Sequence, residues 1–381
     1  MILSEDHQML RSLFREFAEK EFTAELLNEL DEIGEFKREM LEKMAASGFT
    51  GIKIPEEYGG QGGDSLAYAL MIEEFARISP VLSIYANTSN SLGAGPLLIC
   101  GNEDQKRKYL PAIASGEKII VFGLTEPDAG SDAGGIRTTA VEDGDCFLLN
   151  GRKCFTSGAP IADYTLVFAR TDATQKGSRG ISMFVVDMKL PGVSCGKHEE
   201  KMGIKGYPTS DVVLEDVRVP CDCLIGPLHN GYYAAMKTLD GGRLGMAAQA
   251  VGIAQGCLDQ SVTHAKIRKQ FGQPIASFQA ISFMLAEMAT EIEAARQLVY
   301  HTAVSSDSGD PESTKLCSMS KYYAAEMCNR CAYKAVQIHG GYGYIKEYPV
   351  ERFYRDARIA TLYEGTSQVQ QIVISRSLLK E

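Results

Sequence analysis

The first part of the chain carries the apolar spacing of α-helices. Leu10 and the apolar residues that follow it recur at i, i+3, i+4 and i+7, which places them on one face of a helix. Ser4, followed by two acids, is predicted to cap the start of that helix. Glycines between Gly48 and Gly63 break the pattern into short helices joined by turns. We therefore predict an N-terminal helical domain over residues 1–118.

The pattern changes between residues 119 and 229 to short apolar runs with period two. Turn sequences such as Asn150-Gly151 separate these runs. No stretch long enough for a helical crossover lies between them, so a middle β domain with a largely antiparallel sheet is predicted. The predicted strands are 119–122, 146–149, 165–168, 181–186 and 212–214.

Long helical patterns return from residue 230 to the end of the chain. Asp310 is predicted to cap one of these helices, with Pro311 at its first position and Gly340-Gly341 at its end. Helices of this length pack in bundles, in which each buries one stripe of its surface. The order helix, sheet, helix predicts an α+β protein whose third domain covers residues 230–381.

Composition adds the broad class of protein to this picture. The chain has 381 residues, of which 45% are hydrophobic and 23% are charged, so it can form a sizeable core. Its net charge of −10 argues against nucleic acid as the main partner. No apolar run reaches the roughly 18 residues of a membrane span, and the N-terminus lacks a targeting pattern. We expect a cytoplasmic protein that does not bind membranes.

The ten cysteines follow neither a metal-binding nor a disulfide pattern. Cys328 and Cys331 form one C-x-x-C inside a helical pattern, without a second pair to complete a tetrahedral site. Free, buried thiols and no metal are therefore expected. Glycine-rich dinucleotide, P-loop and nucleophile-elbow sequences are also missing, which argues against nicotinamide-dependent enzymes, nucleotide hydrolases and serine hydrolases.

Two glycine-bearing segments are candidate binding loops. Residues 122–132 begin as a strand and end in a loop where backbone N–H groups and the hydroxyls of Thr125 and Ser131 could hold an anion or a heteroaromatic edge. A β-turn with a capping serine explains the same loop. Residues 337–344 hold three glycines at the end of a helix, which fits either a helix C-cap or close approach of a ligand to the backbone.

Glu364 stands between a tyrosine and a Gly-Thr-Ser turn, just before the last predicted helix. Most glutamates in such loops are solvated. This one can act as a base if Thr366 or Ser367 caps the next helix and an apolar ligand surface raises the pKa of the carboxyl group. Arg243 and Arg268, taken one at a time, are expected to be surface charges.

Four of these segments together resemble one protein family, the acyl-CoA dehydrogenases. The resemblance covers nearly the whole chain, points to the short-chain or butyryl-CoA dehydrogenase branch, and extends to anaerobic enoyl-CoA reductases such as caffeyl-CoA reductase. It implies the fold of that family, with an N-terminal helical domain, a middle antiparallel β domain and a C-terminal four-helix bundle. The segments are Leu124-Thr125-Glu126-Pro127, Arg268-Lys269-Gln270-Phe271-Gly272, Gln337-Ile338-His339-Gly340-Gly341 and Tyr363-Glu364-Gly365-Thr366.

The resemblance implies FAD as the cofactor and assigns roles to single residues. Glu364 would remove the α proton of an acyl-CoA thioester while hydride passes from the β carbon to flavin N5. The residues implied at the chain's own FAD are Phe122, Leu124, Thr125, Ser131, Phe155, Ser157, Thr366 and Gln368. Those implied at the FAD of a neighbouring subunit are Arg268, Phe271, Gln279, Gln337, Gly340 and Gly341. Those implied at the CoA thioester are Ser131, Tyr232, Asp240, Arg243 and Gly365.

Two positions refine the resemblance. Some branches of the family carry their base just before the anchoring arginine, but that residue is Gly242 here, which leaves Glu364 as the base. Thr156 stands where the family usually has an aliphatic residue, and it is expected to bring polarity next to the flavin. The partners implied by the resemblance are an acyl-CoA or enoyl-CoA, an electron-transfer flavoprotein, and further copies of the chain in a homotetramer built as a dimer of dimers.

The acyl group and the direction of the reaction stay open at this point. Short-chain or aryl-propanoyl thioesters are favoured, and an enoyl-CoA reductase acting on cyclic or aryl groups with a bifurcating electron-transfer flavoprotein fits the same residues. A non-catalytic helical interaction module is the alternative from another class of protein. The presence of Thr125, Arg268 and Glu364 argues against that alternative.

Overall fold

The computed structural model describes residues 1–379, beginning with a set of short helices. Ser4 caps the first of them, as predicted, because its hydroxyl accepts the N–H of His7. A π-helical segment, η3 (Thr88–Gly93), continues α5 into α6. The α-helices of this part are α1 (Glu5–Glu21), α2 (Ala24–Ile33), α3 (Arg38–Ala46), α4 (Ser65–Ile78), α5 (Pro80–Asn87), α6 (Ala94–Cys100) and α7 (Glu103–Ala114).

An eight-stranded sheet follows, in the order β6-β7-β3-β2-β4-β5-β8 with β1 beside β4. All five predicted runs form strands, and the sheet is largely antiparallel as predicted, with β1 parallel to β4. Three strands were not predicted because they are short or mostly exposed and lack an apolar run. The strands are β1 (Ile120–Gly123), β2 (Thr139–Asp143), β3 (Cys146–Ser157), β4 (Tyr164–Arg170), β5 (Ile181–Asp187), β6 (Val193–Cys195), β7 (Thr209–Pro220) and β8 (Leu224–Ile225).

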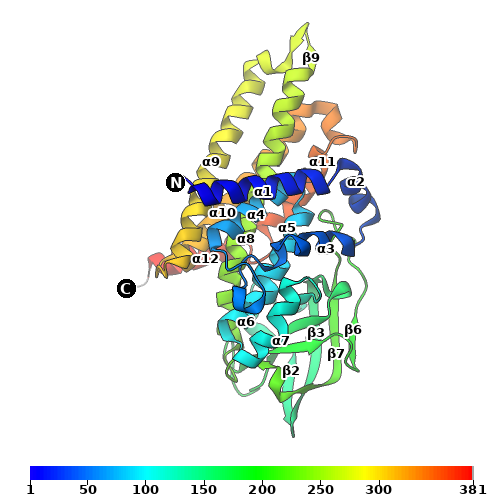
Figure 1. Cartoon of the computed structure of the whole chain (residues 1–381), viewed down its shortest axis with the longest axis vertical. Coiled ribbons are helices and arrows are strands. Elements are labelled where there is room, and N and C mark those ends of the chain that lie inside the picture. The colour runs from blue at the N-terminus through cyan, green and yellow to red at the C-terminus, as the bar shows by residue number, and fades with distance from the viewer. Residues whose placement is uncertain (380–381) are drawn as a thin grey trace.

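Long helices form the rest of the molecule, and the hairpin of β9 (Lys269–Gln270) and β10 (Gln273–Pro274) lies at the far end from the sheet (Figure 1). The predicted start of one helix was wrong. Asp310 accepts the N–H of Glu312 in a turn, so α10 begins after Pro311 rather than with it. The helices are α8 (Gly231–Ile267), α9 (Gln279–Asp307), α10 (Ser313–His339), α11 (Val350–Ala357) and α12 (Ser367–Leu378).

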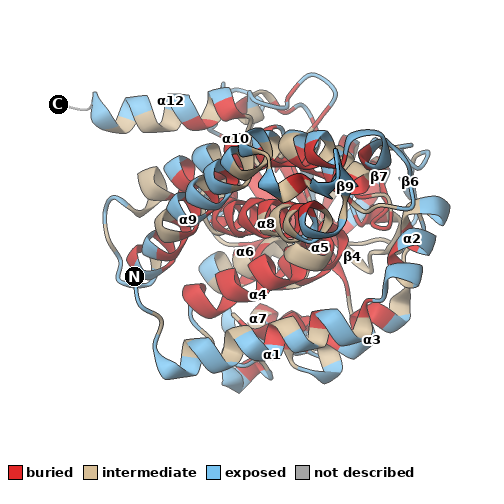
Figure 2. Ribbon diagram, turned by 90° about the horizontal axis from the view of Figure 1, so that it is seen from above, coloured by how far each residue is buried: buried red, intermediate tan, exposed pale blue. Residues whose placement is uncertain are grey.

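Helices α4 and α8 form the centre of the helical core (Figure 2). Helix α8 packs against α4, α9 and α10, so side chains from several helices converge along it. The expectation of buried thiols holds for Cys328 and Cys331 in α10 but not for Cys195 and Cys221, which are exposed. The loop before α12 reaches α8, because Tyr363 is hydrogen-bonded to Gln249 of that helix.

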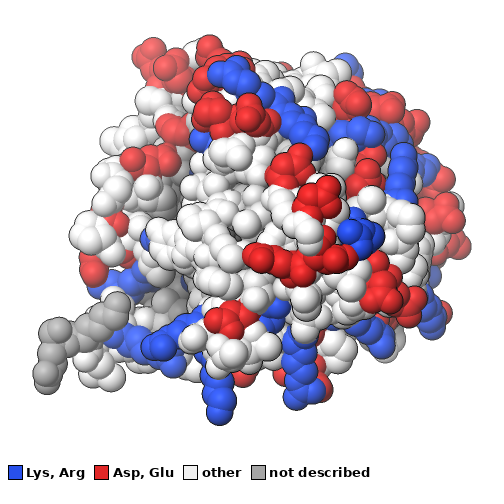
Figure 3. Space-filling view, turned by 90° about the horizontal axis from the view of Figure 1, so that it is seen from below, with Lys and Arg blue, Asp and Glu red and all other residues white. Residues whose placement is uncertain are grey.

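Charged side chains of both signs lie on the face of the molecule that is seen from below. On the face shown in Figure 3, Lys and Arg are interspersed with Asp and Glu, with uncharged atoms between them. Among residues 1–379, no helix is both long enough and apolar enough to cross a membrane.

Candidate active site

The loop between α11 and α12 aims Glu364 into the protein. Glu364 has φ 51° and Gly365 has φ 94°, so two successive residues adopt left-handed conformations. Such a conformation is unusual for a non-glycine residue and persists where the surroundings hold it. Thr366 caps α12 by accepting the N–H of Val369 at 3.2 Å, which confirms one of the two predicted caps. The Tyr363 hydroxyl donates to the Gln249 side chain and ties this loop to α8.

The Glu364 carboxylate is in a site suited to proton transfer. Its Oε2 atom is shielded from solvent and has no hydrogen-bond partner among residues 1–379. Burial raises the pKa of Glu364 to about 7, against the charges of Lys321 and Arg243 and the amide of Asn87. A base is most effective when its pKa lies near the working pH. The alternative of an ordinary solvated loop acid is therefore wrong.

Glycines in α8 provide the space for this carboxylate. A Cβ added at Gly242 would overlap Oε2 of Glu364. One turn further on, a Cβ at Gly245 would overlap the Tyr68 hydroxyl and lie 2.7 Å from Oδ1 of Asn87. Gly242 does more than exclude a rival base at its own position. The observed position of the Glu364 carboxylate requires a residue without a side chain there.

Arg243 and Asp240 lie on the same helix beside the site. Arg243 is buried, so the expectation of a surface charge was wrong for this residue. Its Nη1 donates to Asp240 at 3.0 Å, and the Thr314 hydroxyl donates to the other carboxylate oxygen at 2.7 Å. Nε of Arg243 has no partner in the described part of the chain, so a donor remains available. Tyr232 is half-buried two turns before Asp240 on α8.

The β domain brings Thr125 next to the end of β3. The Thr125 carbonyl accepts the N–H of Cys154 at 2.8 Å. A register shift in β3 and a positive φ of 53° leave Phe155 68% exposed, with Ser157 exposed on the same side. Thr156 is buried, whereas Phe155 and Ser157 on either side of it are exposed, and the expectation that it brings polarity next to the flavin stays a prediction.

The loop after Thr125 contains a tight turn, as one of the two interpretations expected, but Ser131 does not cap the short helix that follows in the described residues. Glu126 and Ala129 exchange backbone hydrogen bonds in a tight turn. The Glu126 carboxylate binds the buried ammonium of Lys153 at 2.6 Å and accepts the N–H of Thr138, contacts that no sequence pattern predicted. Ser131 lies in the exposed part of this loop. Among the implied flavin residues of this loop and the adjoining strand, Phe122 and Thr125 are half-buried and Leu124 is buried.

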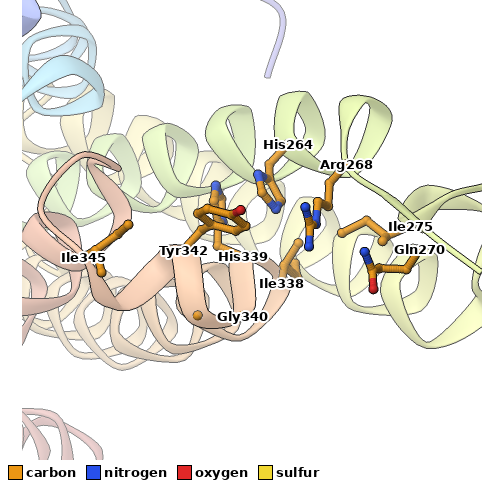
Figure 4. A pocket seen from close by; sticks show the side chains of 10 residues that line it. His264, Arg268, Gln270, Ile275, Ile338, His339, Gly340, Tyr342 and Ile345 are labelled. Atoms are coloured by element: carbon orange, nitrogen blue, oxygen red, sulfur yellow. The ribbon is translucent and has the colours of Figure 1, made fainter.

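A second site lies at the other end of α8. Arg268 borders a pocket of about 470 Å³ (Figure 4), and its guanidinium lies 5.0 Å from the centre of the Tyr342 ring. Gly340 has φ 60°, and a Cβ at Gly340 or Gly341 would meet no atom within 4 Å. Gly340 is the C-cap of α10, since its N–H donates to the carbonyls of Val336 and Gln337, so the helix-cap interpretation is confirmed. The open space beside both glycines leaves their backbone accessible to a ligand.

Two histidines lie in this pocket: His264 was not predicted from the sequence, and His339 belongs to the segment Gln337-Ile338-His339-Gly340-Gly341. The rings of His264 and His339 stack with their centres 4.2 Å apart, next to Tyr342 (Figure 4). Burial lowers the pKa of both imidazoles, so a neutral stacked pair forms one wall. Three other residues implied at this site are exposed around it: Phe271, Gln279 and Gln337.

The two sites are separate within one chain. Gly242 and Arg268 lie 26 residues apart along one helix and its C-cap, which is about 39 Å at 1.5 Å per residue. Gly365, Thr366 and Gln368 belong to the Glu364 side, where Gln368 is exposed on α12.

Three domain families match the chain: acyl-CoA dehydrogenase N-terminal domain over residues 4–117, middle domain over 121–217 and C-terminal domain over 229–379. The chain belongs to the acyl-CoA dehydrogenase family. Its fold is the fold of that family, and it is an oxidoreductase that uses FAD.

Similar proteins cover the chain from end to end. The caffeyl-CoA reductase-Etf complex subunit CarC of Acetobacterium woodii is 57% identical over 100% of both chains, and the 3-(aryl)acrylate reductase of Clostridium sporogenes is 52% identical over 100% of both. Butyryl-CoA dehydrogenase of Megasphaera elsdenii has a solved structure with a TM-score of 0.96 and 42% identity, covering 100% of both chains. A chain in a structure described as electron transferring flavoprotein of Acidaminococcus fermentans has a TM-score of 0.97 and 46% identity, again over 100% of both.

The residues present fit FAD. Thr125 and Ser157 offer hydroxyls around an exposed aromatic, Phe155. The second site offers the Arg268 guanidinium and the open backbone of Gly340, which suit phosphate oxygens.

Proposed function

We propose that Glu364 is the base of this enzyme and removes the α proton of an acyl-CoA thioester. The observation that supports this role is the Oε2 atom, which is shielded, lacks a hydrogen-bond partner among residues 1–379 and lies against Gly242. With a pKa of about 7, the carboxyl group can take up a proton during dehydrogenation and return it during enoyl-CoA reduction.

The backbone N–H of Glu364 binds the carbonyl oxygen of the thioester. Its N–H has no acceptor in residues 1–379, so it is available to bind the oxygen on which enolate charge develops. A donor placed before the reaction stabilises that charge in a site from which water is excluded. Gly365 follows directly and lets the chain turn without a side chain at this point.

Substrate and cofactor are held by groups on either side of Glu364. Arg243 and Asp240 anchor the CoA part, with Tyr232 on the same helix and Ser131 beside the pantetheine. Bound FAD supplies the acceptor for hydride from the β carbon. The residues that hold the chain's own FAD are Phe122, Leu124, Thr125, Ser131, Phe155, Ser157, Thr366 and Gln368.

We propose a homotetramer, built as a dimer of dimers, in which the second site of one chain completes the FAD site of another. The separation of about 39 Å along α8 supports this arrangement. Phe271, at the tip of the β9–β10 hairpin, is 92% exposed in the single chain and is available to a neighbour. The residues that reach the neighbouring FAD are Arg268, Phe271, Gln279, Gln337, Gly340 and Gly341.

The substrate we propose is an aryl-substituted propenoyl-CoA, reduced with electrons from an electron-transfer flavoprotein in the cytoplasm. Support comes from the two relatives named caffeyl-CoA reductase-Etf complex subunit and 3-(aryl)acrylate reductase, which match the full length of the chain. Anaerobic reduction of aryl-propenoyl-CoA and crotonyl-CoA by the purified holoenzyme distinguishes the acyl groups. We expect kcat/KM to favour the aryl thioester by at least about tenfold, and a preference for crotonyl-CoA would refute this substrate.

The role of Glu364 is tested by Glu364→Gln, which keeps the shape of the side chain and removes the base. We expect FAD content and CoA-ester binding to stay near wild type while turnover falls at least about 1,000-fold. Glu142→Gln, an exposed glutamate on β2, is the matched control and keeps wild-type turnover. Retention of more than about one hundredth of the activity by Glu364→Gln would mean that another group is the base.

A further inference from the structure

A buried lysine lies directly behind the Glu364 loop. Lys321, on α10, is fully buried, and its ammonium donates to the carbonyl of Gly365 at 2.6 Å. This is the one hydrogen bond that the ammonium makes among residues 1–379. A buried charge is costly unless it is paired or hydrogen-bonded, so the side chain needs a reason to be there.

Lys321 and Gln370 together fix the backbone of the loop. The Gln370 side-chain amide, also fully buried, donates to the carbonyls of Glu364 at 3.1 Å and Gly365 at 2.9 Å. Both carbonyls are thus held toward α10 and α12. These contacts stabilise the left-handed Glu364-Gly365 turn from the side of α10 and α12. The Glu364 N–H has no acceptor among residues 1–379 and is available to a ligand.

A neutral donor such as an amide could hold the same carbonyl, but Lys321 also brings a charge. Burial lowers the pKa of Lys321 to about 8, against the opposing charge of Glu364, and the ammonium form favours the carboxylate of Glu364. The ionisable groups around this pair are Arg243 and Asp240 on α8, Glu326 on α10, Tyr68 on α4 and Tyr363 in the loop itself. Of these, Arg243 is held by Asp240, and Glu326 accepts the Ser367 hydroxyl at 2.6 Å.

We propose that Lys321 is a positioning residue for the base: its ammonium holds the Gly365 carbonyl, and with it the Glu364-Gly365 turn, and its charge favours the carboxylate form of Glu364. This inference rests on the proposed role of Glu364. Lys321 lies behind the loop and has no direct role toward substrate or cofactor in this proposal.

The test compares Lys321→Met, which removes donor and charge, with Lys321→Gln, which keeps a neutral donor. Loss of the nearby positive charge raises the pKa of Glu364. In the dehydrogenation direction the acid limb of kcat against pH therefore moves upward by about one unit, from a pKa of about 7, and kcat at pH 7 falls about fivefold. Because Arg243 and Asp240 are unchanged, KM for the CoA thioester changes less than about threefold. For Lys321→Gln we expect the same upward shift of the acid limb and a smaller loss of kcat at high pH.

Protonation of Glu364 is also followed without turnover, by infrared titration of its carboxyl band, identified through its absence in Glu364→Gln. We expect this band to titrate at higher pH in both Lys321 variants. Lys334→Met, on the same helix but ion-paired with Glu287 of α9, is the matched control and leaves the band and the pH profile unchanged. FAD content and thermal unfolding confirm that each variant is folded.

The outcomes separate the two proposals. If Glu364→Gln is inactive and both folded Lys321 variants lose activity equally at every pH, without a shift of the carboxyl band, Lys321 has only a structural role and this inference is wrong. Wild-type kinetics in Lys321→Met would refute it as well. If Glu364→Gln stays active, the proposed base is wrong, whatever the Lys321 variants do.

Discussion

At the scale of single residues, the Glu364 site depends on positions where α8 has no side chain. The carboxylate occupies the space of a Cβ at Gly242, and Tyr68 with Asn87 occupies that of a Cβ at Gly245. A glycine inside a helix costs about 1 kcal/mol relative to alanine. These glycines make the helix less stable. They also allow polar groups from α4, α5 and the loop before α12 to lie directly against its backbone.

Gly242→Ala should displace the carboxylate and lower kcat by about 100-fold, because a shift of about 1 Å in a reacting group has effects of that size. FAD content should stay near wild type. The matched control is Gly241→Ala, where the new Cβ meets only Oγ of Ser91 at 3.6 Å, an ordinary contact. Steady-state kinetics of both variants provide the measurement, and equal losses in the two would contradict the assigned role of Gly242.

At the scale of elements, β3 and the loop after β1 are held together by a buried ion pair. Lys153 is fully buried, and its ammonium binds Glu126 and the Leu124 carbonyl. Burial alone would raise the pKa of Glu126, but the charge of Lys153 and the hydrogen bonds of Thr138 and Arg137 keep it below its ordinary value. This pair therefore sets the distance between Thr125 and the exposed end of β3.

Lys153→Met leaves the Glu126 carboxylate buried without its partner, which should lower the free energy of unfolding by about 3 kcal/mol and release FAD. The control Arg152→Met changes the preceding residue on the same strand, whose side chain is largely exposed in its ion pair with Asp211. It should lower the free energy of unfolding by less than about 1 kcal/mol. Chemical denaturation and FAD fluorescence after gel filtration measure both effects. Retained flavin and stability in Lys153→Met would show that the pair does not organise this loop.

At the scale of the whole molecule, α8 connects two sites that one chain cannot bring together. Gly242 and Arg243 lie in its first half, whereas Arg268 follows its end. Closed symmetry provides a solution, since in a two-fold dimer each chain can lend its Arg268 end to the other. In this arrangement a catalytic centre contains residues from two copies.

Mixed oligomers test this arrangement. A chain with Glu364→Gln and a chain with Arg268→Glu should each be inactive alone. Co-expressed, a mixed dimer should regain activity at one of its two centres, where an intact Glu364 meets the intact Arg268 of the other chain. If each chain binds FAD with its own Arg268, no centre in the mixture is complete and activity stays absent.

Local patterns were sufficient for much of this protein. Apolar periodicity located the helical and sheet regions, and the caps at Ser4 and Thr366 followed from side chains that bond three residues away. The polar strand β2 and the start of α10 were missed, because cross-strand pairing and a turn at Asp310 decided them. The motif around Glu364 predicted a base, because the type and order of its residues can be read directly from the sequence.

Tertiary structure alone decided the surroundings of the proposed base, Glu364. Burial raises the pKa of Glu364, Gly242 provides its space, and Lys321 reaches Gly365 across 44 positions of sequence. Desolvation and Coulomb interactions depend on distance in space, and no local pattern encodes which distant segments will meet. For the same reason, the sequence did not predict that His264 stacks on His339 or that Arg243 is buried. The sequence determined which groups are available, and packing determined their environment.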